Sequence, residues 1–392
     1  MGNRYRELIL AAALGLACAT SAGAQTVTDV LTFLLNNQSV QTGSPDRDRQ
    51  AALATTATIS RALAANLATL PVPSSPSGFV YRFNSDLGTM ERASQNFGPF
   101  FVERALTAGR GVTSFGLAFQ QFRFTSLDGQ SLRDGTLVTT ANQFVDEAAP
   151  FDVNQLTLDI DTSVVTFYGS IGVSDHMEVG FAVPFMALNL SGTRVDTYRG
   201  QTFTQAQAEA HASGLADIVV RTKIVAFQEE GSGLAGAVDV RLPTGRSQDL
   251  LGAGTPSVRF SAIGSLEGGR LSSHANAGFT VGGLARELSG AAALAAAAGG
   301  RLTIDGELLG RIIEAPSGIV PVSATNPTLQ GVQTIRLLPG GSRLVMVSAV
   351  AGFKWNLSDT WVLGGSVNIP LTSDGLTAPF TPFIGLDYSL GR

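Results

Sequence analysis

From Val112 to the C-terminus, apolar residues repeatedly alternate with residues that are polar or small. A period of two places successive side chains on opposite faces of a β-strand, so each such stretch predicts a strand with one apolar face. We count about twelve of these stretches, each long enough to cross a bilayer when tilted. Clear examples are Ser114–Phe119, Met177–Val183, Val238–Leu242, Ala275–Val281, Leu302–Leu308, Trp361–Ile369 and Ile384–Leu390.

Composition narrows the class of protein further. Nothing downstream of the first 24 residues offers 18 or more consecutive apolar residues without a charge or a helix breaker, which makes a helical membrane protein a poor fit. Charged residues make up 15% of the chain, whereas soluble globular proteins carry about a quarter. The formal net charge is −5, and because there is no basic excess we predict no nucleic-acid partner.

The connections between the predicted strands alternate in length. Outer-membrane barrels join their strands by short periplasmic turns at one end and by longer external loops at the other. A soluble β-sandwich or propeller, the structural alternative, has no reason to alternate in this way. Residues 111–392 are therefore predicted to form an all-β, antiparallel transmembrane β-barrel of about 12 strands in a bacterial outer membrane. The longer connections follow Phe124, Leu190, Gly245, Val281, Ile313 and Leu371, and the short ones are Val173–His176, Gln228–Gly233, Gly268–Arg270, Gly299–Arg301 and Asn356–Thr360.

Residues 1–24 have the three regions of a secretory signal peptide. Arg4 and Arg6 precede an apolar stretch, and Ala22-Gly23-Ala24 is a small-residue cleavage site. Cleavage there removes Cys18, the single cysteine, and with it any disulfide or thiolate chemistry. The expected partners of such an exported barrel are outer-membrane lipids, the barrel-assembly machinery and periplasmic chaperones.

Residues 25–110 differ from the rest of the chain. Val27–Leu35 and Arg49–Leu70 are predicted helices, and a linker rich in proline and serine follows at Pro71–Gly78. We predict that residues 25–110 form a mainly helical plug inside the barrel or a segment in the periplasm. In a plug, the aromatic pair Phe100 and Phe101 could seal the lumen.

Three motifs connect the predicted barrel with a known family. They are Gly172–Gly180 with Pro184-Phe185, Gly214–Lys223, and Leu242-Pro-Thr-Gly245. On these motifs the region 154–392 resembles the outer-membrane transporter-like family named for a putative MetA pathway of phenol degradation, which is loosely similar to long-chain fatty-acid channels. The resemblance implies passive or facilitated transport of small molecules, aromatic or apolar in character. Outer-membrane barrels tend to end on an aromatic residue, and this chain departs from that pattern by ending in Ser389-Leu-Gly-Arg392.

Strand alternation also predicts which charged side chains face the lumen. If the apolar set faces lipid, charged residues of both signs point inward from three neighbouring strands. One interpretation makes them a polar constriction that selects solutes, and the other makes them a salt-bridged core that keeps buried charges paired. The lumen-lining candidates are Asp217, Arg221, Lys223, Asp239, Arg241 and Arg259.

Two further hypotheses are a structural or adhesive barrel and a lipid hydrolase. Ser126–Asp152, Ser191–Ser213 and Glu314–Gly341 are predicted external loops that an adhesive protein would use. Of the three histidines, only His274 lies on a predicted strand, and it faces inward without a nucleophile motif nearby. No histidines have the spacing of metal ligands. We therefore predict no catalytic residue, no cofactor and no metal site.

Overall fold

The computed structural model describes residues 25–36, 45–73, 81–84, 89–92, 94–229, 232–314, 318–358 and 360–390. The predicted signal peptide and most of the predicted linker lie outside these residues. Within the described part of the chain, no helix is both long enough and apolar enough to span a membrane.

The described strands form a closed antiparallel barrel of twelve strands, which confirms the predicted fold class. Each strand pairs with its neighbour, and pairing of the last strand with the first closes the ring, with Leu386 opposite Leu117. In order around the barrel, the strands are β3 (Thr113–Phe124), β7 (Asp152–Ser174), β8 (Met177–Tyr198), β10 (Ile218–Glu229), β11 (Ser232–Leu242), β12 (Ser257–Gly268), β13 (Leu271–Gly282), β14 (Glu287–Ala297), β15 (Leu302–Ile313), β18 (Leu344–Ser358), β19 (Trp361–Pro370) and β21 (Thr381–Leu390).

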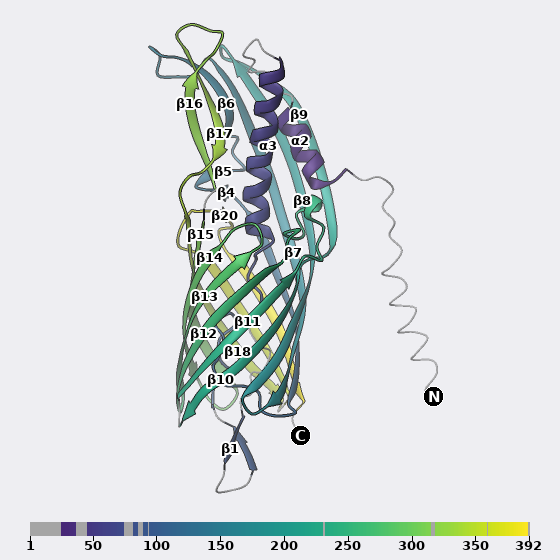
Figure 1. Cartoon of the computed structure of the whole chain (residues 1–392), viewed down its shortest axis with the longest axis vertical. Coiled ribbons are helices and arrows are strands. Elements are labelled where there is room, and N and C mark those ends of the chain that lie inside the picture. Colours follow the sequence, from purple (N-terminus) through teal and green to yellow (C-terminus); the bar gives the residue numbers. More distant parts are fainter. Residues whose placement is uncertain are drawn as a thin grey trace, which may run out of the picture.

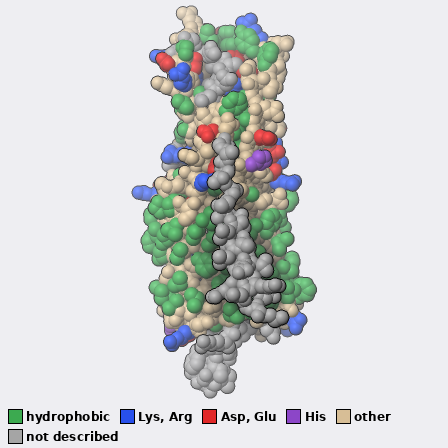
Figure 2. Space-filling model, turned by 90° about the vertical axis from the view of Figure 1, so that its right-hand side faces the viewer, with side chains coloured by type: hydrophobic (Ala, Val, Ile, Leu, Met, Phe, Trp, Pro, Cys, Tyr) green, Lys and Arg blue, Asp and Glu red, His purple; other side chains and the backbone are tan. Residues whose placement is uncertain are grey.

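The apolar members of the alternation point away from the lumen. Phe260 and Leu266 on β12 have exposed fractions of 52% and 62%, whereas Ser265 between them is buried. Large exposed apolar side chains recur on the strands all around the barrel, and Figure 2 shows them gathered over the lower part of the molecule. In water such a surface would be unfavourable, so this belt is the surface that contacts lipid.

The connections follow the predicted alternation in length. Short turns join β7 to β8, β12 to β13 and β14 to β15 at one end of the barrel, where β3 begins and β21 ends. The longer connections lie at the opposite end. Outer-membrane barrels have short periplasmic turns, so we expect the short-turn end to face the periplasm and the opposite end to face the cell exterior.

The three longest connections are not loops, which corrects the prediction for Ser126–Asp152, Ser191–Ser213 and Glu314–Gly341. They contain strands that extend the sheet beyond the barrel, in the order β16-β17-β6-β7-β8-β9. β7 and β8 contain 23 and 22 residues, and at about 3.3 Å per residue they reach well past a hydrocarbon layer of ~30 Å. The added strands are β6 (Leu137–Phe144), β9 (Gln201–Leu215), β16 (Ile319–Thr325) and β17 (Val332–Pro339).

Each of the two long strands changes partners along its length. The first residues of β7 pair with β6 and its later residues pair with β3. β8 pairs with β10 through Met177–Ala182 and then with β9 from Phe185 onward. The change of partner is what continues the barrel wall into an open sheet, which we call the outer extension.

Two helices, α2 (Val27–Asn36) and α3 (Pro45–Leu67), pack against the outer extension (Figure 1). Leu31 and Leu34 of α2 belong to one buried cluster with Leu158 and Leu188 of the long strands. Alanines along β9 are buried in the same cluster, and their small side chains allow α2 to approach the sheet closely. The helices therefore form the apolar core of the outer extension, and they lie at the end of the barrel that carries the long connections.

After α3 the chain continues toward the other end of the barrel. A hairpin of β1 (Tyr81–Asn84) and β2 (Thr89–Arg92) lies beyond the short-turn end, as Figure 1 shows. Residues 94–110 then contact inward-facing side chains near that end before β3 begins. The described residues before 74 and after 80 thus lie toward opposite ends of the barrel.

Asp128 ties together three connections of the outer extension. It lies in the turn between β4 (Ser126–Leu127) and β5 (Gln130–Ser131), with a positive φ of 49°. Its carboxylate accepts hydrogen bonds from the backbone N–H of Ile319 at 2.5 Å and of Gly375 at 2.7 Å. Burial raises the pKa of this carboxyl above its ordinary value of 3.8, although the two backbone donors oppose the shift.

The raised pKa of Asp128 predicts a pH dependence of the outer extension. The folded state holds this proton more tightly than the unfolded chain, so the group stabilises the fold at a pH below 3.8 and loses that contribution as the pH rises through the raised pKa. Asp128→Asn should remove this part of the pH dependence. The test is the urea midpoint in lipid vesicles across this pH range. A slope as steep in Asp128→Asn as in the unsubstituted protein would contradict the assignment to this residue.

Candidate functional site

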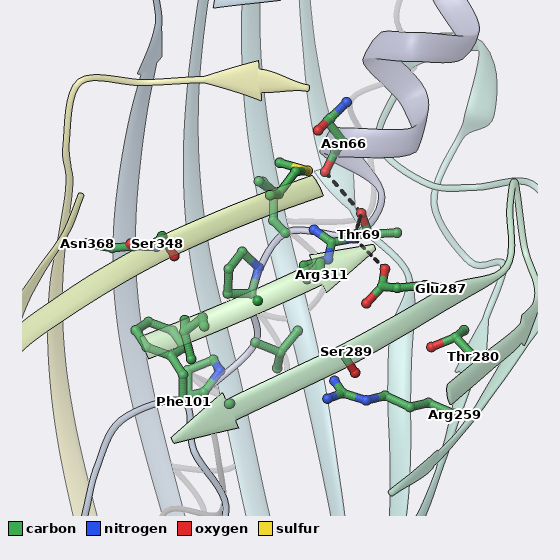
Figure 3. A pocket seen from close by; sticks show the side chains of 18 of the residues that line it. Asn66, Thr69, Phe101, Arg259, Thr280, Glu287, Ser289, Arg311, Ser348 and Asn368 are labelled. Carbon is green, nitrogen blue, oxygen red and sulfur yellow. Dashed lines mark hydrogen bonds and ion pairs between the residues drawn. The ribbon is translucent and has the colours of Figure 1, made fainter. Parts of the chain in front are cut away.

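The barrel encloses a cavity of about 290 Å³ beneath the end of α3 (Figure 3). Its lining comes from three sources: the inner face of the barrel wall, the residues that follow α3, and Phe101 of the segment 94–110. The residues that define its character are Asn66, Thr69, Leu70, Val72, Phe101, Phe122, Phe124, Tyr168, Arg221, Asp239, Arg241, Arg259, Thr280, Glu287, Ser289, Arg311, Met346, Ser348 and Asn368.

One wall of the cavity carries a row of charged side chains set by strand register. Arg221, Asp239 and Arg259 lie directly opposite one another on β10, β11 and β12. Arg259 is in turn opposite Thr280, and Thr280 is opposite Glu287 on β14. Positions in register on adjacent strands share a face of the sheet, so the whole row points into the lumen.

Two arginines of this wall are held by carboxylates. Arg221 donates from Nε and Nη2 to the two oxygens of Asp239, at 2.6 and 2.8 Å. Arg311 donates from Nη2 to Glu287 at 2.6 Å and to the hydroxyl of Thr69 at 2.7 Å, as drawn in Figure 3. Hydrogen bonds within each ion pair offset the free-energy cost of removing the two charged groups from water.

Arginines of the wall also hold the chain where α3 ends. Arg241 donates from Nη1 to the carbonyl oxygen of Ala68 at 2.9 Å, and Arg311 contacts Thr69 next to it. Carbonyl groups at the end of a helix lack intrahelical partners, and an arginine there supplies a charged donor. α3 is thereby fixed over the mouth of the cavity.

The opposite side of the cavity is apolar and aromatic. Phe122 and Phe124 at the end of β3 stack at a centroid distance of 5.7 Å. Tyr168 on β7 and Phe101 on the inner segment line the same space. The cavity therefore presents a charged surface and an aromatic surface to one volume.

The segment 94–110 lies inside the barrel next to this cavity, where it makes polar contacts with the wall. Glu307 on β15 accepts hydrogen bonds from three consecutive backbone N–H groups, those of Phe100, Phe101 and Val102, the shortest to each being 2.6, 3.0 and 2.9 Å. Lys354 on β18 donates to the carbonyl oxygen of Pro99 at 2.7 Å and lies over the Phe100 ring. Barrel side chains thus supply partners for a piece of chain that has no regular structure.

The six predicted lumen residues separate into two groups. Arg221, Asp239, Arg241 and Arg259 line the cavity. Lys223 instead lies buried below it, where it donates to Glu103 at 3.0 Å and to the carbonyl oxygen of Leu106 at 3.0 Å. Asp217 is buried at the top of β10, where both carboxylate oxygens accept hydrogen bonds from backbone N–H groups of the connection between β11 and β12.

Several residues that shape the site were not among the predicted candidates. They include Glu287, Glu307, Arg311 and Lys354, all on strands beyond β12. The same alternation identifies them: Glu307 lies between Gly306 and Leu308, and Lys354 lies between Phe353 and Trp355. The same period of two, read on β14, β15 and β18 as well as on the three strands of the predicted candidates, places these four residues in the lumen.

His274 also faces the lumen, as predicted, but its surroundings are those of a packed side chain. Its Nδ1 is 2.9 Å from the hydroxyl of Ser265, and its Nε2 is 2.9 Å from the hydroxyl of Ser272. The backbone N–H of Ala105 donates to the oxygen of Ser265 at 2.8 Å. Among the described residues, no cluster of three or more histidine, cysteine, aspartate or glutamate side chains could hold a metal ion.

Part of the barrel matches a known protein family. Residues 107–293, from the end of the inner segment through most of β14, match the family model described as "Putative MetA-pathway of phenol degradation". All three motifs identified from the sequence lie within this range. The match covers just under half of the chain and lies within the barrel region, so the barrel is similar to this family.

Solved structures resemble this outer-membrane barrel at low sequence identity. An outer membrane channel from Pseudomonas putida F1 has 12% identity and a TM-score of 0.47, and the similarity covers 73% of this chain and 98% of that one. The KdgM porin has 9% identity, a TM-score of 0.36 and coverages of 61% and 98%. The NanC porin has 5% identity, a TM-score of 0.37 and coverages of 70% and 100%. No curated protein matches the chain significantly.

The motifs that resemble the family form hydrogen bonds that stabilise this outer-membrane barrel. Asp217 of the second motif accepts hydrogen bonds from the N–H of Gly245, in the third motif, at 3.0 Å and of Ala253 at 2.8 Å. The hydroxyl of Thr244 in turn accepts the N–H of Ile218 at 3.0 Å. The second and third motifs therefore join the connection before β10 to the connection after β11.

The first motif holds the inner segment. Glu178 accepts the N–H of Ala108 at 3.0 Å, and Lys223 of the second motif lies 3.7 Å from Glu178. Gly172 exchanges backbone hydrogen bonds with Gly111 and Val112, at 2.7 and 3.0 Å. A Cβ at Gly172 would overlap the carbonyl of Gly109, so only glycine allows the inner segment to lie this close to β7.

These contacts predict that Asp217 stabilises the barrel without touching the solute. Asp217→Asn replaces one acceptor with a donor that faces a backbone N–H, which should lower the free energy of unfolding by about 1–3 kcal/mol. Urea midpoints in lipid vesicles measure this loss, with Asp146→Asn in an exposed turn as the matched control. An unchanged midpoint together with an altered channel current would place Asp217 in solute handling instead.

Proposed function

We propose that this outer-membrane barrel is a passive channel for small solutes that have an aromatic or apolar part. The observation that carries the proposal is the cavity inside a closed barrel, lined on one side by Phe122, Phe124 and Tyr168. Ligand cavities in proteins combine an apolar lining with a few placed polar groups, and this cavity has both. The family's description, which mentions phenol degradation, agrees with an aromatic solute.

In this proposal, the N-terminal region plugs the lumen through the residues that follow α3 and through the segment 94–110, and that segment is the gate; α2 and the β1–β2 hairpin lie outside the lumen. The segment is held by polar contacts, such as those of Glu307 and Lys354, and by small separate apolar clusters around Phe97, Phe100 and Ala105 rather than by a continuous apolar core. Water entering a partly open lumen can replace such contacts, so the segment can leave at a moderate cost. α3 sits over the exterior side of the cavity, and the segment closes its periplasmic side.

Export by a cleaved signal peptide and insertion by the barrel-assembly machinery, with periplasmic chaperones, belong to the same proposal. The belt of apolar side chains around the barrel supports it, because such a surface needs protection until it reaches lipid.

The two alternative functions are less well supported. A structural or adhesive barrel would use the outer extension but has no need of a cavity with charged and aromatic walls. A lipid hydrolase needs a nucleophile that the substrate can reach beside its histidine. His274 and its neighbours Ser265 and Ser272 are all buried, and the Ser265 oxygen already accepts the N–H of Ala105. Lipid hydrolysis that disappears in His274→Ala would favour the hydrolase.

The gate predicts the effect of neutralising Glu307. Glu307→Gln keeps the size of the side chain but removes the charge that accepts three backbone N–H groups, so the segment 94–110 should detach more readily. Loss of a charge-assisted contact of about 1.4 kcal/mol or more corresponds to at least a tenfold higher open probability. Single-channel currents in planar bilayers, recorded with the chain from Gln25 to Arg392, measure this probability.

The matched control is Glu209→Gln, which removes an exposed carboxylate on β9 and should leave the currents unchanged. Equal open probabilities in Glu307→Gln and in the unsubstituted protein would contradict the gate. Silence in both forms, with a heat-modifiable folded barrel on a gel, would contradict the channel itself.

A further inference from the structure

The cavity wall carries more arginines than carboxylates that pair with them. Four arginines line it, and the carboxylates of this wall, Asp239 and Glu287, are engaged by Arg221 and Arg311. Among the described residues, neither Arg241 nor Arg259 forms an ion pair within 4 Å. Arg241 donates one hydrogen bond to the carbonyl oxygen of Ala68, which is a neutral acceptor.

Arg259 is the less satisfied of these two arginines. Its Nε is buried and has no hydrogen-bond partner among the described residues. Its side chain lies over Gly278, where an added Cβ would come within 2.8 Å of Nε. Figure 3 shows the guanidinium beside Ser289, directed into the cavity. Because Nε is removed from water without a direct partner, and Asp239 and Glu287 already pair with Arg221 and Arg311, the arrangement favours an anion from outside the chain.

The nearby carboxylates hydrogen-bond to other groups. Both oxygens of Asp239 accept from Arg221, and both oxygens of Asp217 accept from backbone N–H groups. Asp374, also in the lining, accepts the backbone N–H of Val345 at 2.8 Å. The free donors of Arg259 and Arg241 are therefore directed at the cavity rather than at the protein.

The rest of the cavity limits which anion fits. A planar guanidinium fork matches a carboxylate with two parallel hydrogen bonds. The facing wall of Phe122, Phe124 and Tyr168 offers an apolar surface, which a bare inorganic anion would not use. At about 290 Å³ the cavity is just smaller than the usual range for ligand pockets, about 300–1,000 Å³, so it suits a small molecule.

We propose that Arg259, assisted by Arg241, binds the carboxylate of a small organic acid whose ring-sized apolar body lies against the aromatic wall. This inference rests on the proposed channel function and names its solute class. The site would select an amphipathic anion over the neutral molecule of the same shape, since only the anion satisfies the buried guanidinium.

Calorimetric titration of the folded chain from Gln25 to Arg392 tests the site with three probes. Benzoate should bind at least about tenfold more tightly than benzyl alcohol, which lacks the carboxylate, and than inorganic phosphate, which lacks the apolar body. Benzoate that binds no better than benzyl alcohol would overturn the proposal. Phosphate that binds as tightly as benzoate would overturn the aromatic part of it.

Variants assign the binding to particular residues. Arg259→Gln should weaken benzoate binding about tenfold or more and leave the binding of benzyl alcohol unchanged. Arg270→Gln, in the exposed turn at the far end of β12, is the matched control and should change neither. Unaltered benzoate binding in Arg259→Gln would overturn the assignment, and Arg241→Gln provides a second variant with a smaller expected loss.

The site and the channel can fail separately. A barrel that conducts after Glu307→Gln but shows no preference for benzoate contradicts the site alone. A barrel that binds benzoate through Arg259 but never conducts contradicts the channel and leaves an anion-binding site in the lumen.

Discussion

A barrel of twelve strands encloses more space than the inward side chains of its own wall fill, and most of this structure follows from that constraint. The space is occupied by chain that precedes the barrel: α3 lies above it, and the segment 94–110 lies inside it. Because that segment has no regular structure, its backbone groups need partners from the wall. Glu307, Lys354 and Glu178 provide them, and the buried charges of the lumen are the means by which the barrel holds its own N-terminal region.

The same constraint explains why the lumen has two kinds of charged residue. Lys223 and Arg221 share Glu103 of the inner segment, and these contacts are structural. Arg259 and Arg241 line the cavity beside Arg221, and among the described residues no carboxylate of the segment 94–110 pairs with them. A salt-bridged core and a selective cavity, which are competing interpretations of the sequence, thus adjoin in one lumen and share Arg221.

The barrel could be predicted from the sequence because lipid on the outside and polar groups on the inside enforce a period of two on every strand. The outer extension could not, since β9 carries Gln201, Thr202 and Gln207 and has the composition of a loop. Its strand conformation comes from pairing with β8 and from the packing of α2, which are tertiary effects. Alternation likewise placed Arg221 and Lys223 inward, but their partner Glu103 lies more than 100 positions away in the chain and has no local signal.

α2 and the short turns lie at opposite ends of the barrel, and we place α2 outside the cell and the short turns in the periplasm. Labelling of intact cells with a membrane-impermeant maleimide tests this orientation directly, because Cys18, the single native cysteine, lies in the predicted signal peptide. Phe33 is 51% exposed on α2, and Arg270 is exposed in the turn between β12 and β13. Phe33→Cys should react in intact cells, whereas Arg270→Cys should react only after the outer membrane is permeabilised. Labelling of Phe33→Cys only after permeabilisation would place the helices in the periplasm and contradict the account.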